Sequence, residues 1–186
     1  MPSHLHAKYS ILALNAKKHV VCEKPMATNL KDADRMIKAA KKNKRILTIF
    51  QNRRYMPDFL MVKKIIDSGG LGRIVQIMMA DHHFARRWDW QTLKKYGGGT
   101  LNNTGPHPID QALILFGPKK PKVFCIRDRA LTLGDAEDHV KVILYGKGSP
   151  TIEIEITAAC AYPCLLYTSP SPRDLSTSRM PSSACK

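Results

Sequence analysis

The sequence of 186 residues has no run of about 18 consecutive apolar residues, so it offers no membrane-spanning helix. Its first residues lack the apolar stretch and small-residue cleavage site of a secretory signal. Its five cysteines include no CxxC pair of the kind that binds zinc or exchanges disulfides. A reducing, cytoplasmic location is therefore expected. An export signal on a missing amino-terminal part stays an open alternative.

Acidic residues are scarce: 15 Asp and Glu face 30 Lys and Arg, which gives a net charge of +15. Such an excess raises the question of a nucleic-acid partner. The densest basic run, residues 41–45, falls at the polar end of an amphipathic helix, and the other basic residues are scattered, as on a solvated face. His82 and His83 are adjacent on a predicted strand and point to opposite faces, which disfavours a shared metal ion. We expect no nucleic acid, membrane or metal.

The pattern of residues 1–52 predicts an α/β fold. Buried strands are expected at residues 19–22 and 46–50, with a helix between them that Asn29 caps. Apolar strands that alternate with helices are typical of a parallel sheet covered on both faces. Another helix precedes the first strand. Its buried face is expected to carry Leu5, Tyr9, Leu12, Ala13 and Ala16.

Residues 53–160 predict a second, α+β domain with a mostly antiparallel sheet. One helix starts at Pro57 and ends at Gly69, and another spans 108–116 and ends at Gly117. Between them, residues 88–103 look like a long functional loop. Strands are expected at 74–79, 123–126, 140–145 and 151–157. In the last strand, isoleucines alternate with glutamates, so one face should be buried and the other wet.

The end of the chain, residues 161–186, changes character. It is rich in Ser, Pro and Thr and has no apolar periodicity, so we expect it to be disordered. Residues 164–184 also resemble the translated adapter sequence found at the ends of metagenomic gene calls. The tail is therefore expected to be artefactual, with a genuine disordered linker as the alternative.

Two segments present residue types suited to catalysis. Lys24 follows the first predicted strand, which Pro25 halts, and this edge of a parallel sheet is where ligands bind. On spacing alone, a surface lysine in a turn is the favoured alternative. The glycines 97–99 lead to His107 at a helix start, where the helix dipole keeps an imidazole neutral and able to accept a proton. A capping or core histidine explains that position equally well.

Three strings together resemble the Gfo/Idh/MocA oxidoreductase family over about residues 1–160: KHVVCEKPMA at 18–27, QNRRY at 51–55, and GGGTL at 97–101, running on to Gly105, His107 and Asp110. The resemblance implies a Rossmann domain joined to an antiparallel α/β substrate domain. It further implies NAD or NADP as cofactor, and hydride transfer to or from a secondary alcohol of a sugar or polyol. Members usually form homo-oligomers through the outer face of the substrate-domain sheet.

The resemblance also implies roles for individual residues. Lys24 would lie near the nicotinamide and the reacting hydroxyl, and His107 would exchange the substrate proton. Asn103 stands where the family most often has Asp, and an amide can orient a hydroxyl but cannot take its proton. The cofactor side is expected to include Pro2, His6, Glu23, Lys24, Pro25 and Gln51. The substrate side is expected to include Arg54, Arg87, Trp88, Asp89, Asn103 and His107.

A dinucleotide-binding GxGxxG motif is missing, and residues 70–72 lack its third glycine. Since one βαβ unit needs about 30 residues, roughly 60 or more residues of a Rossmann domain are expected to be absent at the front. The chain is thus expected to be a fragment truncated at both ends, inactive alone, that binds NAD or NADP weakly or not at all. Two alternatives stay open: a non-catalytic sugar-binding or scaffolding relative, which Asn103 permits, and a basic nucleic-acid-binding module.

Overall fold

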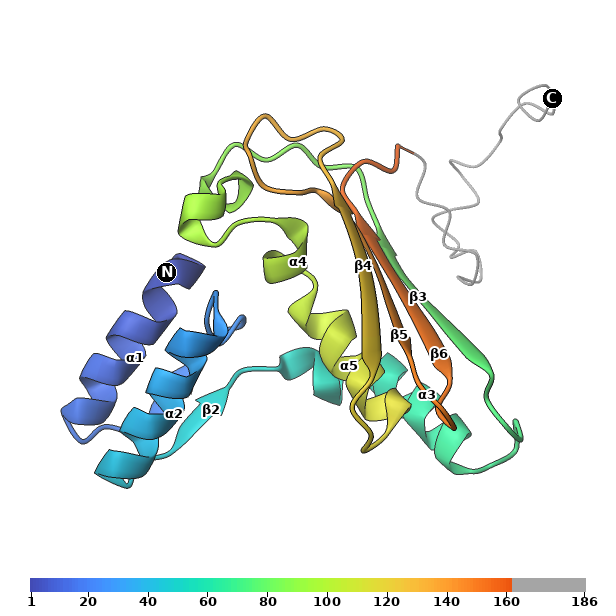
Figure 1. The fold of residues 1–186 in the computed structure, drawn as a ribbon, viewed down its shortest axis with the longest axis horizontal. Coiled ribbons are helices and arrows are strands. Elements are labelled where there is room, and N and C mark those ends of the chain that lie inside the picture. The colour runs from blue at the N-terminus through green and yellow to red at the C-terminus, as the bar shows by residue number, and fades with distance from the viewer. Residues whose placement is uncertain (162–186) are drawn as a thin grey trace.

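The computed structural model describes residues 1–161. The expectation for the adapter-like tail concerns residues that, from 162 onwards, lie outside this described part. Two groups of elements lie side by side (Figure 1). A two-stranded sheet with two helices forms one group, and a four-stranded sheet with its own helices forms the other.

The first group has the expected order of helix, strand, helix and strand. Its elements are α1 (His6–Asn15), β1 (Val20–Cys22), α2 (Leu30–Asn43) and β2 (Leu47–Ile49). β1 and β2 pair in parallel, with Val21 opposite Thr48, which confirms the predicted parallel sheet. The side-chain oxygen of Asn29 accepts a hydrogen bond from the backbone N–H of Asp32 at 2.9 Å, so the predicted cap of α2 is also confirmed.

The predicted buried face of α1 is wrong. Tyr9 and Leu12 are 48% and 55% exposed, whereas Ala7 and Leu14 are buried. Apolar side chains occur on more than one side of this helix, and spacing alone does not say which side meets a neighbour. The helix packs on α2 and β1 through the side that carries Ala7, which leaves Tyr9 beside a groove along Val21 of β1.

The second group follows a short 3-10 helix at Asn52–Tyr55. Its elements are α3 (Pro57–Asp67), β3 (Gln76–His82), α4 (Thr100–Asn103), α5 (Pro106–Phe116), β4 (Lys122–Asp128), β5 (His139–Tyr145) and β6 (Thr151–Thr157). The sheet order is β3-β6-β5-β4, and β6–β5 and β5–β4 are antiparallel as expected. β3 and β6 pair in parallel, because the chain crosses the sheet through α5 between them.

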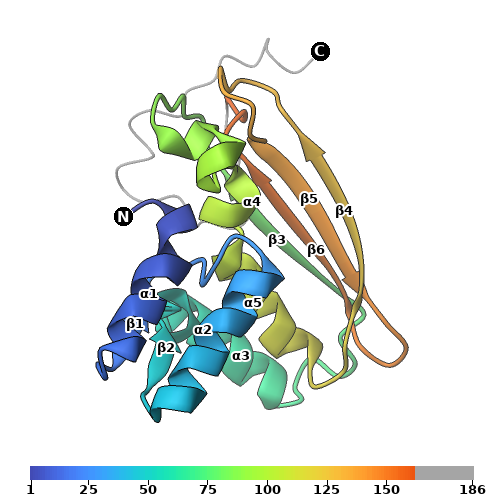
Figure 2. The ribbon, with the colours of Figure 1, turned by 60° about the vertical axis from the view of Figure 1, so that its left-hand side comes forward.

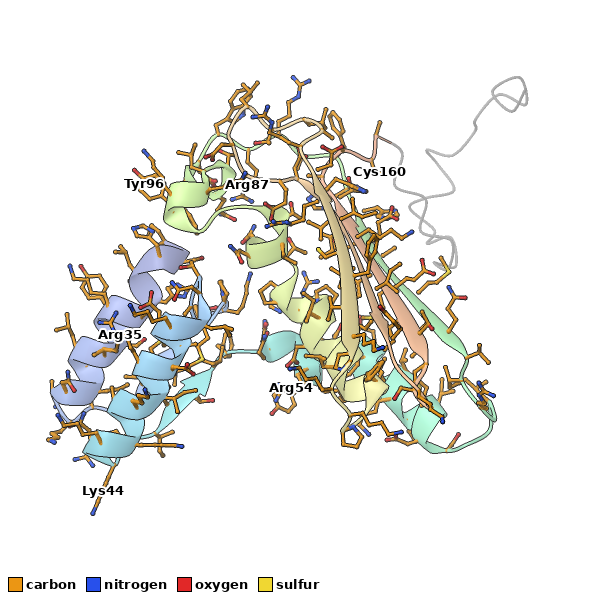
Figure 3. All side chains as sticks on the ribbon, in the orientation of Figure 1. Arg35, Lys44, Arg54, Arg87, Tyr96 and Cys160 are labelled. Atoms are coloured by element: carbon orange, nitrogen blue, oxygen red, sulfur yellow. The ribbon has the colours of Figure 1, made fainter. Side chains whose placement is uncertain are left out.

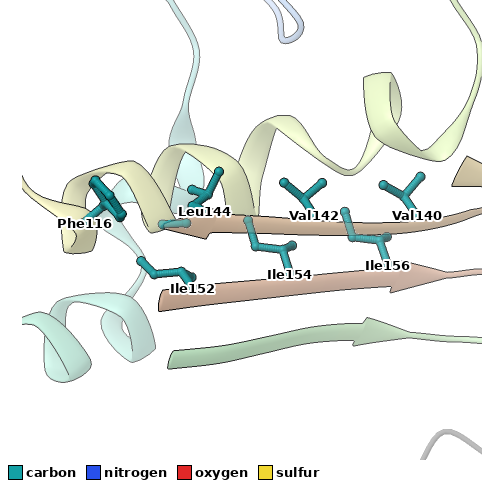
Figure 4. Close-up of a cluster of buried hydrophobic side chains, with 8 residues drawn as sticks. Phe116, Val140, Val142, Leu144, Ile152, Ile154 and Ile156 are labelled. Carbon is teal, nitrogen blue, oxygen red and sulfur yellow. The ribbon is translucent and has the colours of Figure 1, made fainter. Parts of the chain in front are cut away.

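The core of the second group lies between α5 and the sheet (Figure 4). Ile152, Ile154 and Ile156 of β6 are at most 1% exposed and pack with Val140, Val142 and Leu144 of β5. Glu153 and Glu155 face the other way, as the alternation predicted, and both lie within 3.5 Å of Lys141. Burying each isoleucine side chain contributes about 1.5–3 kcal/mol, so this layer anchors α5 firmly.

Residues 88–103 contain more local structure than the predicted loop, namely two 3-10 helices, Trp90–Thr92 and Lys94–Tyr96, and α4. This segment lies near the start of α1 in both Figure 1 and Figure 2. There Nδ1 of His4 lies 3.3 Å from the carbonyl oxygen of Tyr96, and the two rings are 5.1 Å apart. The contact ties the two groups of elements together.

Candidate functional site

Lys24 projects from the turn that follows β1 towards the second group of elements. Its Nζ atom donates a hydrogen bond to the backbone oxygen of Asn103, at the end of α4, over 2.5 Å. Burial lowers the pKa of the Lys24 amine; the carboxylate of Glu23 opposes this shift, and the Arg53 cation adds to it. The lysine therefore bridges two segments that are distant in sequence.

His107 is the second residue of α5 and is only 8% exposed. Burial lowers its pKa to about 4, and the positive charges of Lys24 and Arg53 act in the same direction. Its Nδ1 atom is buried and has no hydrogen-bond partner within residues 1–161. At neutral pH the ring is thus an uncharged imidazole whose hydrogen-bonding capacity is not fully used.

The fold brings Lys24 to the backbone of Asn103, four residues before His107, and the Lys24 charge lowers the pKa of the His107 imidazole. A neutral imidazole can take a proton from a hydroxyl group, and an ammonium group can stabilise the oxygen anion that results. Both groups sit where water is partly excluded, which strengthens such interactions. The arrangement is chemically suited to removing or returning the proton of an alcohol.

Gln51 lies beside this pair, just after β2. Its amide nitrogen donates to the backbone oxygen of Pro106 at 3.2 Å, while its Oε1 atom is buried without a partner in the described part. Gln51 Oε1 and His107 Nδ1 are thus two buried polar atoms without a partner in the described residues, a feature that fits the amide-bearing nicotinamide end of a dinucleotide. The pyrophosphate end does not fit, because residues 1–68 contain no glycine and so supply no glycine-rich phosphate cradle.

Two of the other residues expected on the cofactor side, Pro2 and His6, are engaged with the protein itself. The backbone oxygen of Pro2 accepts from the N–H of Leu5 at 3.0 Å. His6 is 4% exposed, and its ring nitrogens face the backbone oxygens of Pro25 and Met1. Neither residue presents a free polar side chain to a ligand.

A polar pocket lies next to Lys24 and shares Asn103 with it. Loops at one end of the large sheet line this pocket, which includes His83, Arg87, Gln91, Thr92, Thr100, Asn103, Thr104, Thr132, Glu137 and Asp138. Hydroxyl and amide groups dominate the lining, and such groups can both donate and accept hydrogen bonds. Neither Lys24 nor His107 lines the pocket directly; Lys24 is bonded to the lining residue Asn103, and the backbone N–H of His107 donates to the lining residue Thr104 at 3.1 Å.

Among the residues expected to bind substrate, only Arg87 and Asn103 line the pocket. The Arg87 guanidinium also contacts the Asp89 carboxylate at 2.6 Å and lowers the pKa of that carboxyl. Trp88 between them is 74% exposed. Arg54 lies on the segment that links the two groups of elements (Figure 3) and forms a two-point ion pair with Asp110, with contacts of 2.9 and 2.5 Å.

Three charged residues near the site were missed from the sequence. The charge of Arg53 lowers the pKa values of both Lys24 and His107. The sequence offered no reason to prefer Arg53 over its neighbour Arg54 as a residue of the site. Glu137 lies against Gly99 and accepts from the N–H of Leu101 at 3.2 Å. Buried Asp138 accepts three backbone N–H groups, from residues 130, 131 and 132, and so shapes the pocket wall. Glu137 and Asp138 belong to no motif that could have singled them out.

Within residues 1–161, no group of three or more His, Cys, Asp or Glu side chains is placed to hold a metal ion. His82 instead contacts Glu155 at 3.1 Å, and His83 contacts Asp81 at 3.5 Å. In the same residues, no helix combines the length and the apolar character needed to cross a membrane.

Two family profiles match the chain. The oxidoreductase family with an NAD-binding Rossmann fold matches residues 1–51, and the GFO/IDH/MocA C-terminal domain matches residues 59–171. An oxidoreductase of Schizosaccharomyces pombe is 36% identical over 152 residues, which are 78% of this chain and 40% of that protein. The scyllo-inositol 2-dehydrogenase (NADP(+)) IolW of Bacillus subtilis is 34% identical, with 78% and 41% covered.

A similar structure is that of the WlbA dehydrogenase from Bordetella pertussis in complex with NADH and UDP-GlcNAcA. It superposes with a TM-score of 0.78 at 28% identity, over 88% of this chain and 52% of that one. The chain therefore spans about two fifths of the curated relatives and about half of the solved structure.

Proposed function

The chain belongs to the Gfo/Idh/MocA oxidoreductase family, whose members bind NAD(P), and we propose that it serves hydride transfer between the nicotinamide and a secondary alcohol of a sugar or polyol. The observation that carries this proposal is the bond of Lys24 Nζ to the backbone oxygen of Asn103, four residues before the buried His107, whose Nδ1 has no partner in the described residues. The nicotinamide, when bound, supplies the hydride acceptor.

The chain's own residues handle the proton and the charge. In alcohol oxidation, the C–H bond of the carbinol carbon would break and its electron pair would leave as hydride to a bound, oxidised nicotinamide. The O–H proton passes to the imidazole of His107, and the C–O bond becomes a carbonyl. The Lys24 ammonium stabilises the developing oxygen anion, while Asn103 orients a hydroxyl through hydrogen bonds.

The substrate class follows from the pocket and from the relatives. The pocket is lined by threonines, a glutamine and an asparagine, which suit a polyhydroxylated molecule. One relative is a scyllo-inositol dehydrogenase. We assign Arg87 and Asn103 to substrate contact. Arg54 is better explained as holding α5 through Asp110, since its Nε and one of its outer nitrogens both donate to that carboxylate.

We further propose that this chain is part of a longer enzyme, divided at about residue 52 into a partial Rossmann domain and a partial substrate domain of residues 53–160. Lacking a phosphate cradle, the 186-residue chain should bind NAD(P) weakly or not at all. Its described cysteines, Cys22, Cys125 and Cys160, are free thiols, which suits a cytoplasmic location.

The proposal includes a homo-oligomer formed through the outer face of the four-stranded sheet. Phe124 and Ile126 of β4 and Tyr145 of β5 are 54%, 47% and 42% exposed on that face. A second copy of the protein would bury these side chains. Size-exclusion chromatography with light scattering tests this part, and a monomer at micromolar concentration contradicts it.

Turnover of the protein encoded by the complete gene tests the central proposal. NAD⁺ and NADP⁺ are offered with a panel of polyols and sugars, and formation of the reduced nicotinamide is followed by absorbance. Oxidation is expected for the wild type and lost in Lys24→Met and His107→Gln. Polyol binding without turnover would instead identify a non-catalytic relative. Calorimetric titration of the 186-residue chain with NADH checks the fragment, and micromolar binding would refute that part.

A further inference from the structure

His6 contacts the turn that carries Lys24. Its ring is 4% exposed, and Nδ1 lies 2.7 Å from the backbone oxygen of Pro25, the residue after Lys24. The nearby side chain of Cys22, at the end of β1, raises the pKa of this ring. One side chain from α1 thus holds the turn directly after Lys24.

The contact with Pro25 fixes where the ring carries a proton. A carbonyl oxygen only accepts hydrogen bonds, so Nδ1 must be the donor. The other ring nitrogen, Nε2, lies 3.4 Å from the backbone oxygen of Met1, which is a weaker contact. A neutral imidazole protonated at Nδ1 keeps the short bond, and so does the cation. The bond to Pro25 is therefore independent of the charge on His6.

The position of the Lys24 amine depends on this turn. The residues between β1 and α2 belong to neither a helix nor a strand, so they have no regular hydrogen-bond ladder to hold them. The lysine stem is flexible, yet Nζ meets the backbone oxygen of Asn103 at 2.5 Å. A small change in the backbone at Lys24 would move the ammonium away from that oxygen and from His107.

We propose that His6 is a positioning residue: its Nδ1–H bond to Pro25 fixes the backbone at Lys24 and so holds the Lys24 ammonium beside Asn103 and His107. Its role is to arrange the site and not to bind the cofactor, since both ring nitrogens face backbone oxygens. The inference deepens the proposed function, because it takes Lys24 and His107 as the working pair.

Two amide substitutions test whether the Nδ1–H donor of His6, and not the rest of the ring, is what matters. In His6→Asn the amide nitrogen falls near the position of Nδ1 and can still donate to Pro25, whereas in His6→Gln it falls near Nε2. Ser10→Ala, which changes another buried polar residue of α1 one turn further on, serves as the control. The measurement is an NMR titration of the His107 imidazole in the 186-residue chain, assigned by comparison with His107→Gln.

The Lys24 charge lowers the pKa of His107, so that pKa reports where the ammonium lies. His6→Asn and Ser10→Ala are expected to keep it near 4, and His6→Gln to raise it by roughly half a unit or more. Equal pKa values in the two amide variants would overturn the proposal, even if both lowered the melting temperature. If His6→Gln does not fold, His6→Asn must still fold with the wild-type pKa; an unfolded Asn variant also overturns it.

The titration needs neither cofactor nor turnover. A protein that fails to oxidise polyols contradicts the proposed function, but the His107 pKa can still be measured and compared between the His6 variants. Conversely, an unchanged His107 pKa in His6→Gln contradicts the positioning role while turnover stands. The two failures are therefore distinguishable.

Discussion

Replacing His107 with glutamine should remove much of the acid sensitivity of this protein's stability. In the folded chain the pKa of His107 is lowered from 6.5 to about 4, because the ring is buried and lies near the cations of Lys24 and Arg53. The unfolded chain keeps the ordinary value, so it binds a proton more readily than the folded chain does. Stability is therefore unaffected above about pH 6.5, falls as the pH drops towards 4, and levels off below that.

The size of the effect follows from the shift. One pKa unit corresponds to about 1.4 kcal/mol, so the whole change is on the order of 3 kcal/mol and about 2 kcal/mol is lost by pH 5. His107 is 8% exposed, so little of this is screened by water. The shifts of two other groups fall outside this window. His6, whose pKa is raised, contributes stability that is lost only as the pH rises above 6.5, and Asp89, whose pKa is lowered, matters only below 3.8.

Urea unfolding at several pH values between 7 and 4.5, followed by circular dichroism, measures the free energy of unfolding for the wild type and His107→Gln. Glutamine is polar but carries no charge, so the difference between the two curves isolates the imidazole. The wild type should lose about 2 kcal/mol more than the variant between pH 7 and 5. Parallel curves would refute the conclusion that His107 is held neutral by burial beside two cations.

Three further predictions concern the groups around the site. Lys24→Met should raise the pKa of His107 by about one unit, since it removes a positive charge. NMR titration measures this pKa, and an unchanged value would mean that the Lys24 charge does not act on His107. Asp138→Asn should destabilise the protein by roughly 2–4 kcal/mol, because the carboxylate accepts three backbone N–H groups; thermal and urea unfolding would show a smaller loss if those bonds were unimportant. A double-mutant cycle of Arg54→Ala and Asp110→Asn should give a coupling of only about 0.5–1 kcal/mol, since the Arg54 side chain is 44% exposed; a coupling near zero would mean that the ion pair does not hold α5.

The fold could be predicted well where patterns are local. Local signals placed the elements within a few residues, because each signal depends on neighbours in the chain. These signals are the alternation in 151–157, the Asn29 cap, and the helix start and stop residues Pro57, Gly69 and Gly117. Two features needed the tertiary structure. The buried side of α1 depends on which neighbour the helix meets, and the parallel pairing of β3 with β6 depends on the path of the chain through α5.

The same division applies to the candidate site. Lys24 and His107 could be singled out from a strand end and a helix start, but their proximity depends on contacts such as that of Lys24 with Asn103, 79 positions away. Arg53 and Arg54 are adjacent in a 3-10 helix, and no periodicity indicates which one acts on the pair. Glu137 reaches the pocket only because the loop between β4 and β5 folds onto Gly99.

Transfer of deuterium tests the central claim most directly. The protein encoded by the complete gene is incubated with oxidised nicotinamide cofactor and a polyol deuterated at its carbinol carbons, and the reduced cofactor is examined by mass spectrometry and NMR. We predict one deuterium on the nicotinamide ring with the wild type and none above background with Lys24→Met or His107→Gln. Reduced cofactor that carries solvent hydrogen, or transfer that survives the loss of both side chains, would contradict the account.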